Sequence, residues 1–319
     1  MPVTRIAKVP SPRLRQRFVA TGTIGPCEAG KPDLIPPRSI VLDDTGIYFD
    51  ATHPSGLECL LGETRFDAAL LARAAALRRF IVDKALTKYN VESHVPPGWV
   101  TGGRPVVLVP GQVESDASIA LGGAAIRTNM ELLATARKAR PDAFLVYKPH
   151  PDVMSGNRRG RVAREAALDH ADHVETQASI VACLAHADEL HTITSQAGFD
   201  ALLRGVKVVT HGAPFYAGWG LTEDYAGDHP ALARRGRRLS LDELVAGALL
   251  LYPRYWDPHL AAFVEAEAAV TTIAAERERL ANGGAPERLL RGFWRRQGRK
   301  ATVLARAWLI PHRNRLSPP

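Results

Sequence analysis

The stretch ELHTITSQAGFDALLRGVKVV, from Glu189 to Val209, contains one complete strand, helix and strand unit. Its pattern predicts a strand from Glu189 to Thr194, a helix from Gln196 to Arg204 and a second strand at Val206-Lys-Val-Val209. A helix that connects two such strands is typical of a parallel sheet, because parallel strands need a crossover connection. This unit therefore indicates an α/β fold.

The same alternation of strands and helices extends toward the N-terminus. Val106-Val-Leu-Val109 and Phe144-Leu-Val-Tyr147 are typical of buried strands, and helices are expected from Asn129 to Ala139 and from Ala178 to Ala187. Together these segments predict a Rossmann-type nucleotide-binding lobe, in which helices cover both faces of a parallel sheet. Ligands of such sheets bind beyond the carboxyl ends of the strands.

The segments before this lobe are less regular. The start of the chain carries little periodicity apart from a short strand near Arg17 to Ala20. Ser39-Ile-Val-Leu42 and Ile47-Tyr-Phe49 flank a turn and predict a hairpin, and apolar residues at helical spacing predict a helix from Arg65 to Lys88. The proline- and glycine-rich loop at residues 95–103 is the expected lobe boundary.

The C-terminal third predicts helices from Leu241 to Leu251 and from His259 to Asn282, after which two glycines act as a stop signal. A basic tail with interleaved tryptophan and leucine begins at Pro286. The expected division is a partial N-terminal lobe, the Rossmann-type lobe, and C-terminal helices with the tail, at residues 1–100, 101–258 and 259–319.

The composition is that of a folded enzyme-sized protein, with 319 residues of which 46% are hydrophobic and 23% charged. No apolar run is long enough to span a membrane and no signal peptide is apparent, so we expect a cytoplasmic protein. Cys27, Cys59 and Cys183 stand far apart, which argues against a zinc site or a disulfide framework.

The formal net charge of +8 points to an anionic partner, which could be nucleic acid, a nucleotide sugar or an acidic lipid surface. The basic residues concentrate in the tail, where they suit a membrane-surface helix as well as a solvated helical face. Nothing besides charge supports a nucleic-acid binder, and we expect no nucleic-acid partner.

The first of four loops after predicted strands is GQVESDAS, from Gly111 to Ser118. Glu114 and Asp116 bring two carboxylates to the start of a helix, and glycosyl transfer uses such groups to attack or stabilise the anomeric carbon. The alternative is that Asp116 or Ser115 only caps the helix.

The second loop is Lys148-Pro-His150-Pro151. The prolines hold two cationic or donor side chains at the end of a strand, where they could stabilise the phosphate of a departing nucleotide. The alternative is a rigid surface turn with solvated charges.

The third loop, Thr194-Ser195-Gln196-Ala-Gly198, opens a helix whose free N–H groups favour a phosphate. Alternatively, Ser195 is an ordinary N-cap and Gly198 allows close packing of the helix.

The fourth loop, from His211 to Asp224, contains Phe215, Tyr216 and Trp219 among several glycines. Exposed aromatic side chains would be costly unless they pack on a ligand or on another lobe. The alternative is a hydrophobic plug beneath the next helix.

In this order and spacing, the four loops closely resemble the capsule polysaccharide synthesis family of KpsC/LipB type, through GQVESDAS, KPHP, TSQAGFDALLRG and GAPFYAGWGLTED. The segment from Ser39 to Glu58 is also similar, so the resemblance covers roughly Pro36 to Asp257. It implies a GT-B-like fold and a retaining transferase that moves β-Kdo, an eight-carbon acidic ketosugar, from CMP-Kdo to the lipid-anchor linker of capsule chains.

By the same resemblance, Asp116 would attack the anomeric carbon and hold the sugar as a covalent adduct, with Glu114 as a second candidate for this role. His150 and Lys148 would lie against the CMP phosphate. The other expected donor-binding residues are Gln112, Ser195, Gln196, Gly198, Phe215, Tyr216, Gly218 and Trp219. No cofactor or metal ion is implied beyond the donor itself.

The implied partners are CMP-Kdo, a glycolipid acceptor at the inner-membrane surface and other capsule synthesis proteins, which would place the chain in the cytoplasm or peripherally on that membrane. Family modules carry an E-D-G-F-like stretch in the acceptor lobe, whereas Gln16 to Gly25 read QRFVATGTIG. We therefore expect a single module with a shortened N-terminal lobe. This departure leaves open a catalytically silent nucleotide-sugar-binding or scaffolding protein of capsule synthesis and export.

Overall fold

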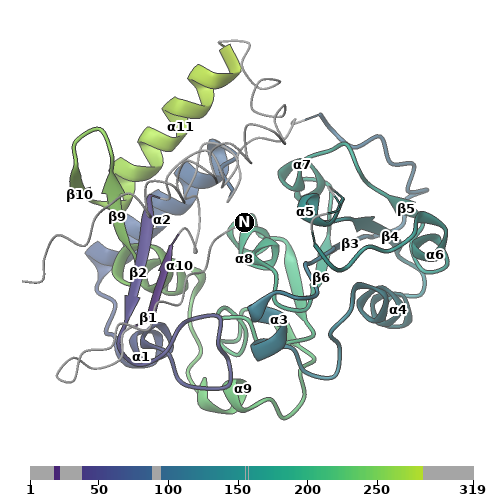
Figure 1. The fold of residues 1–319 in the computed structure, drawn as a ribbon, viewed down its shortest axis with the longest axis horizontal. Helices are drawn as coiled ribbons and strands as arrows, with labels where there is room; N and C mark the ends of the chain where they lie inside the picture. Colours follow the sequence, from purple (N-terminus) through teal and green to yellow (C-terminus); the bar gives the residue numbers. More distant parts are fainter. Residues whose placement is uncertain (1–17, 22–37, 88–94, 155, 157, 283–319) are drawn as a thin grey trace, which may run out of the picture.

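The computed structural model describes residues 18–21, 38–87, 95–154, 156 and 158–282. Their elements form two lobes side by side, one around a six-stranded sheet and the other around a smaller four-stranded sheet (Figure 1). The fold class is α/β, as predicted. Within these residues, no helix combines the length and the apolar character that a membrane span requires.

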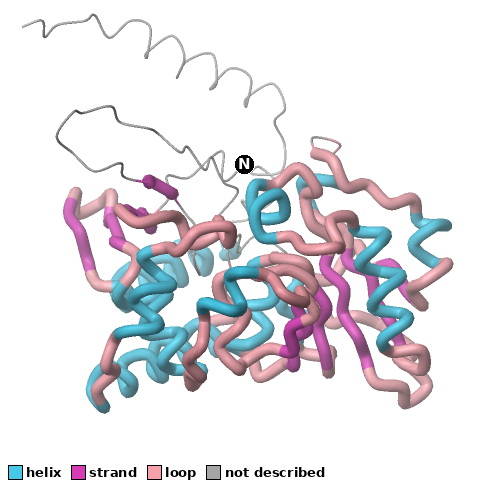
Figure 2. The backbone as a smooth tube through the Cα atoms, turned by 90° about the horizontal axis from the view of Figure 1, so that it is seen from below, coloured by secondary structure: helices cyan, strands magenta, loops and turns pink. Residues whose placement is uncertain are grey.

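The larger sheet is parallel throughout, with strand order β5-β4-β3-β6-β7-β8. Its strands are β3 (Val106–Pro110), β4 (Phe144–Lys148), β5 (His173–Val174), β6 (Glu189–Thr192), β7 (Lys207–Thr210) and β8 (Glu223–Asp224). Figure 2 shows them (magenta) running side by side in one half of the molecule. The four predicted strands are confirmed, and β5 and β8 are short additions at the two edges.

Helices cover both faces of this sheet. The helices of this lobe are α3 (Ala117–Gly122), α4 (Asn129–Ala139), α5 (Pro151–Met154), α6 (Arg164–Leu168), α7 (Ile180–Leu184), α8 (Gln196–Leu203) and α9 (Pro230–Arg234). On one face α4 packs against Val107 and Val109 of β3, and on the other α8 shares a core with Leu108. The bounds of α4 agree with the prediction because Thr128 and Glu131 form a capping box. The segment predicted as a helix from 178 to 187 is helical only in α7.

The smaller lobe combines segments from both ends of the described chain. Its antiparallel sheet has the order β1-β2-β9-β10, with β1 (Phe18–Thr21), β2 (Ser39–Asp43), β9 (Arg254–Asp257) and β10 (Ala262–Val264). Its helices are α1 (Gly56–Glu63), α2 (Ala68–Asp83), α10 (Leu241–Val245), the π-helix η1 (Ala246–Leu251) and α11 (Ala266–Asn282). Together α10 and η1 make up the predicted C-terminal helix from 241 to 251.

The predicted hairpin between Ser39–Leu42 and Ile47–Phe49 is wrong, because β2 pairs with β1 and β9 instead. The turn itself is present: Asp43 Oδ1 accepts hydrogen bonds from the backbone N–H groups two and three residues later. Its Oδ2 accepts from the N–H at the start of α1 and from the hydroxyl of Tyr252. The chain therefore turns into α1, and a distant segment supplies the strand partner.

Two predicted helices are shorter than expected. The helix predicted from His259 to Asn282 begins only at Ala266, because the residues before it form β10, which pairs with β9. The helix predicted from Arg65 to Lys88 corresponds to α2, whose N-cap Asp67 accepts a hydrogen bond from a backbone N–H of the first turn. In both places the local apolar spacing did not locate the start of the helix.

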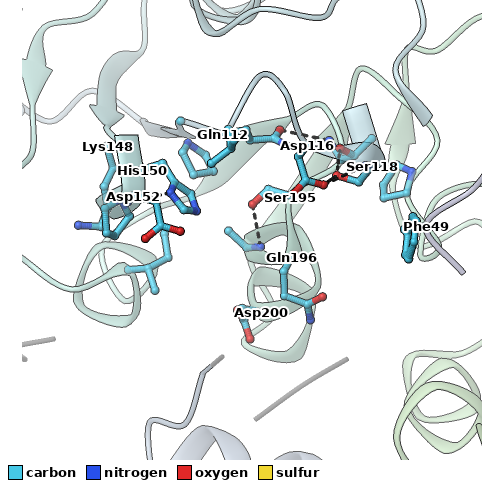
Figure 3. Close-up of a pocket in the computed structure, with 18 of the residues that line it drawn as sticks. Phe49, Gln112, Asp116, Ser118, Lys148, His150, Asp152, Ser195, Gln196 and Asp200 are labelled. Carbon is cyan, nitrogen blue, oxygen red and sulfur yellow. Dashed lines mark hydrogen bonds between the residues drawn. The ribbon is translucent and has the colours of Figure 1, made fainter. Parts of the chain in front are cut away.

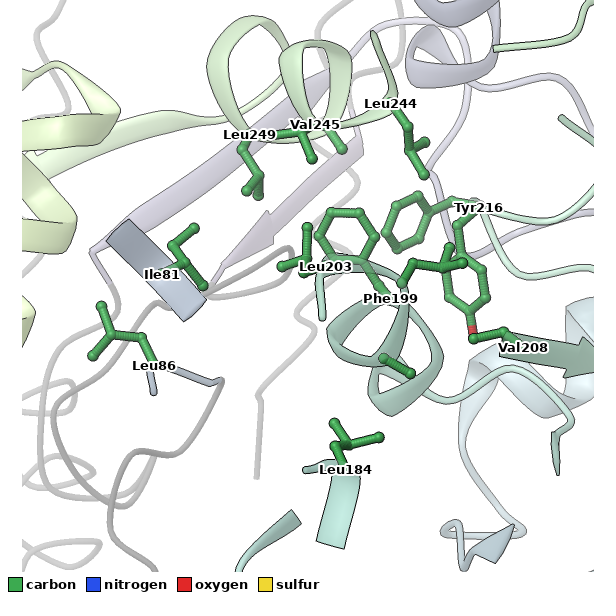
Figure 4. Packing of buried hydrophobic residues seen from close by; sticks show 14 of the residues in the cluster. Ile81, Leu86, Leu184, Phe199, Leu203, Val208, Tyr216, Leu244, Val245 and Leu249 are labelled. Carbon is green, nitrogen blue, oxygen red and sulfur yellow. The ribbon is translucent and has the colours of Figure 1, made fainter. Parts of the chain in front are cut away.

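One apolar core joins the two lobes. Phe199 and Leu203 of α8 belong to the same buried cluster as Ile81 of α2 and Leu249 of η1 (Figure 4). The lobes are thus held together by apolar packing, which fixes the space between them. The division at residues 100 and 258 stays a prediction. The basic tail from Pro286 onward and most of the segment from Gln16 to Gly25 lie outside the described residues.

Candidate active site

A cavity of about 210 Å³ lies at the carboxyl ends of the parallel strands, between the two lobes. The loops that follow β3, β4, β6 and β7 line it on one side, and Tyr48 and Phe49 of the smaller lobe line it on the other. Asp116, His150 and Ser195 all line this one cavity (Figure 3). The structure therefore brings together residues from three predicted loops that are far apart in sequence.

The carboxylate of Asp116 is exposed at the cavity and also caps α3. Its Oδ1 accepts hydrogen bonds from the N–H and the hydroxyl of Ser118, at 2.9 and 2.8 Å. The described residues donate no hydrogen bond to Oδ2. Asp116 therefore caps α3 and lines the cavity at the same time. Its Oδ1 is held by Ser118, and its Oδ2 accepts no hydrogen bond from the described residues.

Glu114 is directed elsewhere. It does not line the cavity, and its Oε1 accepts a hydrogen bond of 2.8 Å from the backbone N–H of Asn129. The geometry favours Asp116 as the carboxylate that meets a ligand. Which of the two acts as the nucleophile stays a prediction.

The loop after β4 places two polar groups on the cavity wall. Lys148 is 8% exposed, and its Nζ donates to the carbonyl oxygen of Ala178 at 2.6 Å. The Nδ1 of His150 accepts a hydrogen bond from the backbone N–H of Asp152 at 3.1 Å, so in the neutral ring the proton is on Nε2. His150 can therefore act as a hydrogen-bond donor without carrying a full charge.

The helix α8 begins at the cavity. Ser195 is its N-cap and accepts a hydrogen bond from the N–H of Ala197 at 3.2 Å. Gln196, the first helical residue, lines the cavity next to it, and its buried Nε2 has no hydrogen-bond partner among the described residues. A helix N-terminus with an unpaired buried amide is suited to receive the oxygens of an anionic ligand.

Gln112 lines the cavity, but its amide is occupied by the protein. Its Oε1 accepts hydrogen bonds from the N–H groups of Ile193 and Thr194 and from the hydroxyl of Thr192, at 3.0 to 3.2 Å. Its Nε2 donates to the Thr194 hydroxyl. Gln112 thus ties the loop after β3 to the loop after β6 and sets the distance between them.

The fourth loop divides into a part at the cavity and a part beneath it. Phe215 lines the cavity, whereas Tyr216 and Trp219 are fully buried and do not. The Tyr216 hydroxyl donates to the carbonyl oxygen of Ser195 at 2.5 Å, and a Cβ at Gly198 would lie 2.2 Å from that hydroxyl oxygen. The close-packing interpretation of Gly198 is therefore the one that the structure shows.

Trp219 completes this buried layer. Its Nε1 donates to the carbonyl oxygen of Phe215 at 2.9 Å, and the Arg235 guanidinium lies 5.9 Å from its ring centroid. Gly218, which precedes it, has a φ of +83° and lies outside the cavity wall. A direct contact of Gly198, Tyr216, Gly218 and Trp219 with a nucleotide stays a prediction, and their present role is to support the loop.

A buried histidine pair lies at the start of the fourth loop. His191 Nδ1 and His211 Nε2 are 3.1 Å apart, and His191 Nε2 is 2.6 Å from Glu189 Oε1. Burial, together with the neighbouring His191, lowers the pKa of His211 to about 4. His211 is therefore neutral at physiological pH.

Several cavity residues were missed by the sequence analysis. Tyr48 and Phe49 were read as a strand, and Arg158 lay in a segment with no predicted element. Asp200 stands one helical turn after Gln196 and shares its face of α8, a spacing that could have identified it. Within the described residues no group of three potential metal ligands gathers, and a metal-free reaction stays a prediction.

The fold and the cavity define a class. Two lobes with a cavity at the carboxyl edge of the parallel sheet, together with the match to solved KpsC structures, make this a GT-B-like protein. The sequence model described as "Capsule polysaccharide biosynthesis protein" matches residues 99–255. The chain belongs to the capsule polysaccharide synthesis family of KpsC/LipB type.

Individual relatives agree with this assignment. The chain is 43% identical over 269 residues to the capsule polysaccharide modification protein LipA of Neisseria meningitidis serogroup B, a match that covers 84% of the chain and 37% of LipA. It is 40% identical over 259 residues to the lipopolysaccharide-processing protein LpsZ of Rhizobium meliloti, covering 80% and 57%. The chain therefore spans less than two thirds of the length of these relatives.

Two solved structures of Thermosulfurimonas dismutans KpsC are similar as well. The β-Kdo 2,7 transferase has 40% identity and a TM-score of 0.63, over 76% of this chain and 73% of the other. The β-Kdo 2,4 transferase has 34% identity and a TM-score of 0.73, over 82% and 80%. The similarity thus holds over most of the chain in both sequence and structure.

Proposed function

We propose that this chain is a glycosyltransferase of capsule polysaccharide biosynthesis that transfers β-Kdo from CMP-Kdo with retention of configuration. The observation that carries the proposal is the shared cavity of Asp116, His150 and Ser195. It places an exposed carboxylate beside a hydrogen-bond donor and a helix N-terminus. The relationship to two Kdo transferases supports the choice of sugar.

In the first step Asp116 acts as the nucleophile. A carboxylate oxygen forms a bond to the anomeric carbon of the sugar, and the bond from that carbon to the phosphate oxygen breaks, with its electron pair leaving on CMP. The hydrogen bonds from Ser118 to Oδ1 hold the carboxylate in place and leave Oδ2 for the attack. The product of this step is a sugar ester on Asp116.

The groups around the phosphate stabilise the leaving CMP. His150 donates through Nε2, and Lys148 retains two N–H donors besides the one bonded to Ala178. At the start of α8 the buried Nε2 of Gln196, which has no partner among the described residues, is a further donor on the cavity wall. These donors act on the negative charge that develops as the sugar bond breaks. No step in this scheme depends on a further cofactor.

In the second step a hydroxyl of the acceptor attacks the same carbon, and the bond to Asp116 breaks with its electron pair returning to the carboxylate. The proton of that hydroxyl passes to a base. Two inversions in sequence give net retention. The acceptor in this proposal is the glycolipid linker of the capsule chain, at the inner face of the cytoplasmic membrane and together with other capsule synthesis proteins.

A protein that binds a nucleotide sugar without turnover is the second candidate. The observation that favours it is the capping hydrogen bond that Asp116 Oδ1 accepts from the N–H of Ser118 in α3, which a purely structural aspartate would also accept.

The decisive experiment incubates the purified protein with CMP-Kdo, with and without a Kdo-terminated glycolipid. With donor alone, peptide mass spectrometry should locate one added Kdo on the peptide that contains Asp116. With the acceptor present, CMP should be released and the product should carry a β linkage by NMR. CMP binding in calorimetry without release of CMP would support the second candidate instead, and an α-linked product would exclude retention.

A further inference from the structure

We infer that Arg158 binds the carboxylate of the donor sugar and thereby selects a 2-ketosugar acid over a neutral sugar. This inference rests on the proposed donor site and adds the residue that binds the carboxylate of the donor sugar. Arg158 lines the cavity and is half-buried. None of the sequence motifs described above contains Arg158.

A buried asparagine fixes the segment that ends at Gly160 against the loop that carries Asp116. Asn129 is 1% exposed, and its Nδ2 donates to the carbonyl oxygens of Gln112 and Gly160 at 2.9 and 2.8 Å. Its Oδ1 accepts from the N–H of Gln112 at 2.8 Å. One side chain therefore holds two loops together.

Two further contacts strengthen the same attachment. The N–H of Glu114 donates to the carbonyl oxygen of Arg159 at 3.1 Å. Gly160 has a φ of +118°, and a Cβ there would lie 2.7 Å from the carbonyl oxygen of Gln112. Any other residue at 160 would force the loops apart, so the backbone beside Arg158 is tied to the loop of Asp116.

The charges in the cavity differ in how they are used. Lys148 donates one of its three N–H groups to Ala178, and the ring of His150 is oriented by the N–H of Asp152. Within the part of the chain that the structure describes, the Arg158 side chain makes no hydrogen bond or ion pair. A cavity-lining guanidinium without a protein partner is suited to an anionic ligand group, and its planar fork matches a carboxylate.

The proposed chemistry requires such a cation. In a 2-ketosugar acid the carboxylate is attached directly to the anomeric carbon, so the attack of Asp116 brings two carboxylates close together. Their repulsion opposes the approach unless a positive charge lies next to the donor carboxylate. His150, Lys148 and Gln196 serve the phosphate in the proposed arrangement, which leaves Arg158 for the carboxylate.

The test compares the affinity for CMP-Kdo with the affinity for CMP, by calorimetry on the full chain carrying Asp116→Asn to prevent turnover. In this background Arg158→Gln should lower the ratio of the two affinities by about 30-fold, the size expected for a charge-assisted hydrogen bond. Arg158→Lys should recover part of the loss, because it restores the charge without the fork. The matched control is Arg159→Gln, which removes an exposed neighbouring charge outside the cavity wall.

Retained CMP binding shows that each variant is folded. An unchanged ratio in Arg158→Gln would overturn the inference, and so would an equal loss of affinity for both ligands, which would assign Arg158 to the phosphate. If Arg159→Gln lowered the ratio of the two affinities as much as Arg158→Gln, the effect would come from the loss of any nearby positive charge. That result would also overturn the inference. Absence of binding of either ligand to the wild-type chain would refute the proposed function as well, whereas binding without turnover would leave the inference about Arg158 standing.

Discussion

The loop after β3 and the loop after β7 have the same position relative to the parallel sheet but differ in what they present to the cavity. Both follow a parallel strand and both contain glycine among residues suited to ligand contact. The first exposes the carboxylate of Asp116, while the second buries Tyr216 and Trp219 and leaves only Phe215 at the cavity among its aromatic residues. Position after a strand therefore identifies the ligand side of the sheet, but not the side chains that face the ligand.

The difference follows from what each side chain can satisfy within the protein. The large rings of the loop after β7 gain from burial, and Tyr216 and Trp219 donate hydrogen bonds to nearby backbone carbonyl oxygens. Among the residues that the structure describes, donors reach only one of the two carboxylate oxygens of Asp116, and the other has no protein donor there. Substitutions in the two loops should accordingly affect different properties.

The largest effect is expected for Asp116→Asn. Loss of the proposed nucleophile should lower the proposed Kdo transfer by at least about 1,000-fold, a size typical of removing a covalent catalyst. Asparagine caps a helix as well as aspartate does, so the free energy of unfolding should change by less than about 1 kcal/mol. Transfer kinetics and urea unfolding measure the two quantities. The control is Ser115→Ala, at an exposed neighbour outside the cavity wall. If both variants lost the same transfer activity, Asp116 would not have the catalytic role proposed for it.

The next effect is expected for Trp219→Ala, on stability. Removing a 1% exposed tryptophan should lower the free energy of unfolding by about 3–5 kcal/mol, through lost apolar burial and the cavity left behind. CMP affinity of the folded protein should stay within a few-fold of wild type. Leu260→Ala, at a side chain that is 68% exposed, should change stability by less than about 0.5 kcal/mol. A stable variant with lost CMP affinity would instead place Trp219 in the donor site.

The smallest effect concerns the pH dependence of the free energy of unfolding, through His211 at the start of the loop after β7. The pKa of His211 is about 4 in the folded protein because burial disfavours its charged form, against about 6.5 in the unfolded chain. Its contribution is therefore complete above pH 6.5 and is lost as the pH falls from 6.5 through 4, by a total of about 3 kcal/mol.

Denaturant unfolding of wild type and His211→Gln between pH 8 and pH 4 measures this contribution. The stability difference between the two proteins should shift in favour of the variant as the pH falls, because glutamine cannot take up a proton. If the difference in unfolding free energy between the two proteins did not change with pH, burial of neutral His211 would not contribute to the pH dependence of stability.

The sequence alone determined the parallel α/β lobe and the ligand side of its sheet. Uniformly apolar strands such as Val106–Pro110 and capped helices such as Asn129–Ala139 are specified by neighbouring residues, because burial on both faces and N-terminal capping leave local patterns. The motifs at Asp116, His150 and Ser195 could be located for the same reason.

Only the tertiary structure decided which side chains reach the cavity and what faces them. The strand partner of β2, the wall at Tyr48 and the attachment of the Arg158 segment through Asn129 all depend on contacts between residues distant in sequence. Such contacts leave no periodic pattern, since their partners are set by the packing of whole elements rather than by the residues beside them. The burial of Tyr216 and Trp219 belongs to the same group: an aromatic residue in a loop carries no local sign of the direction in which its ring will point.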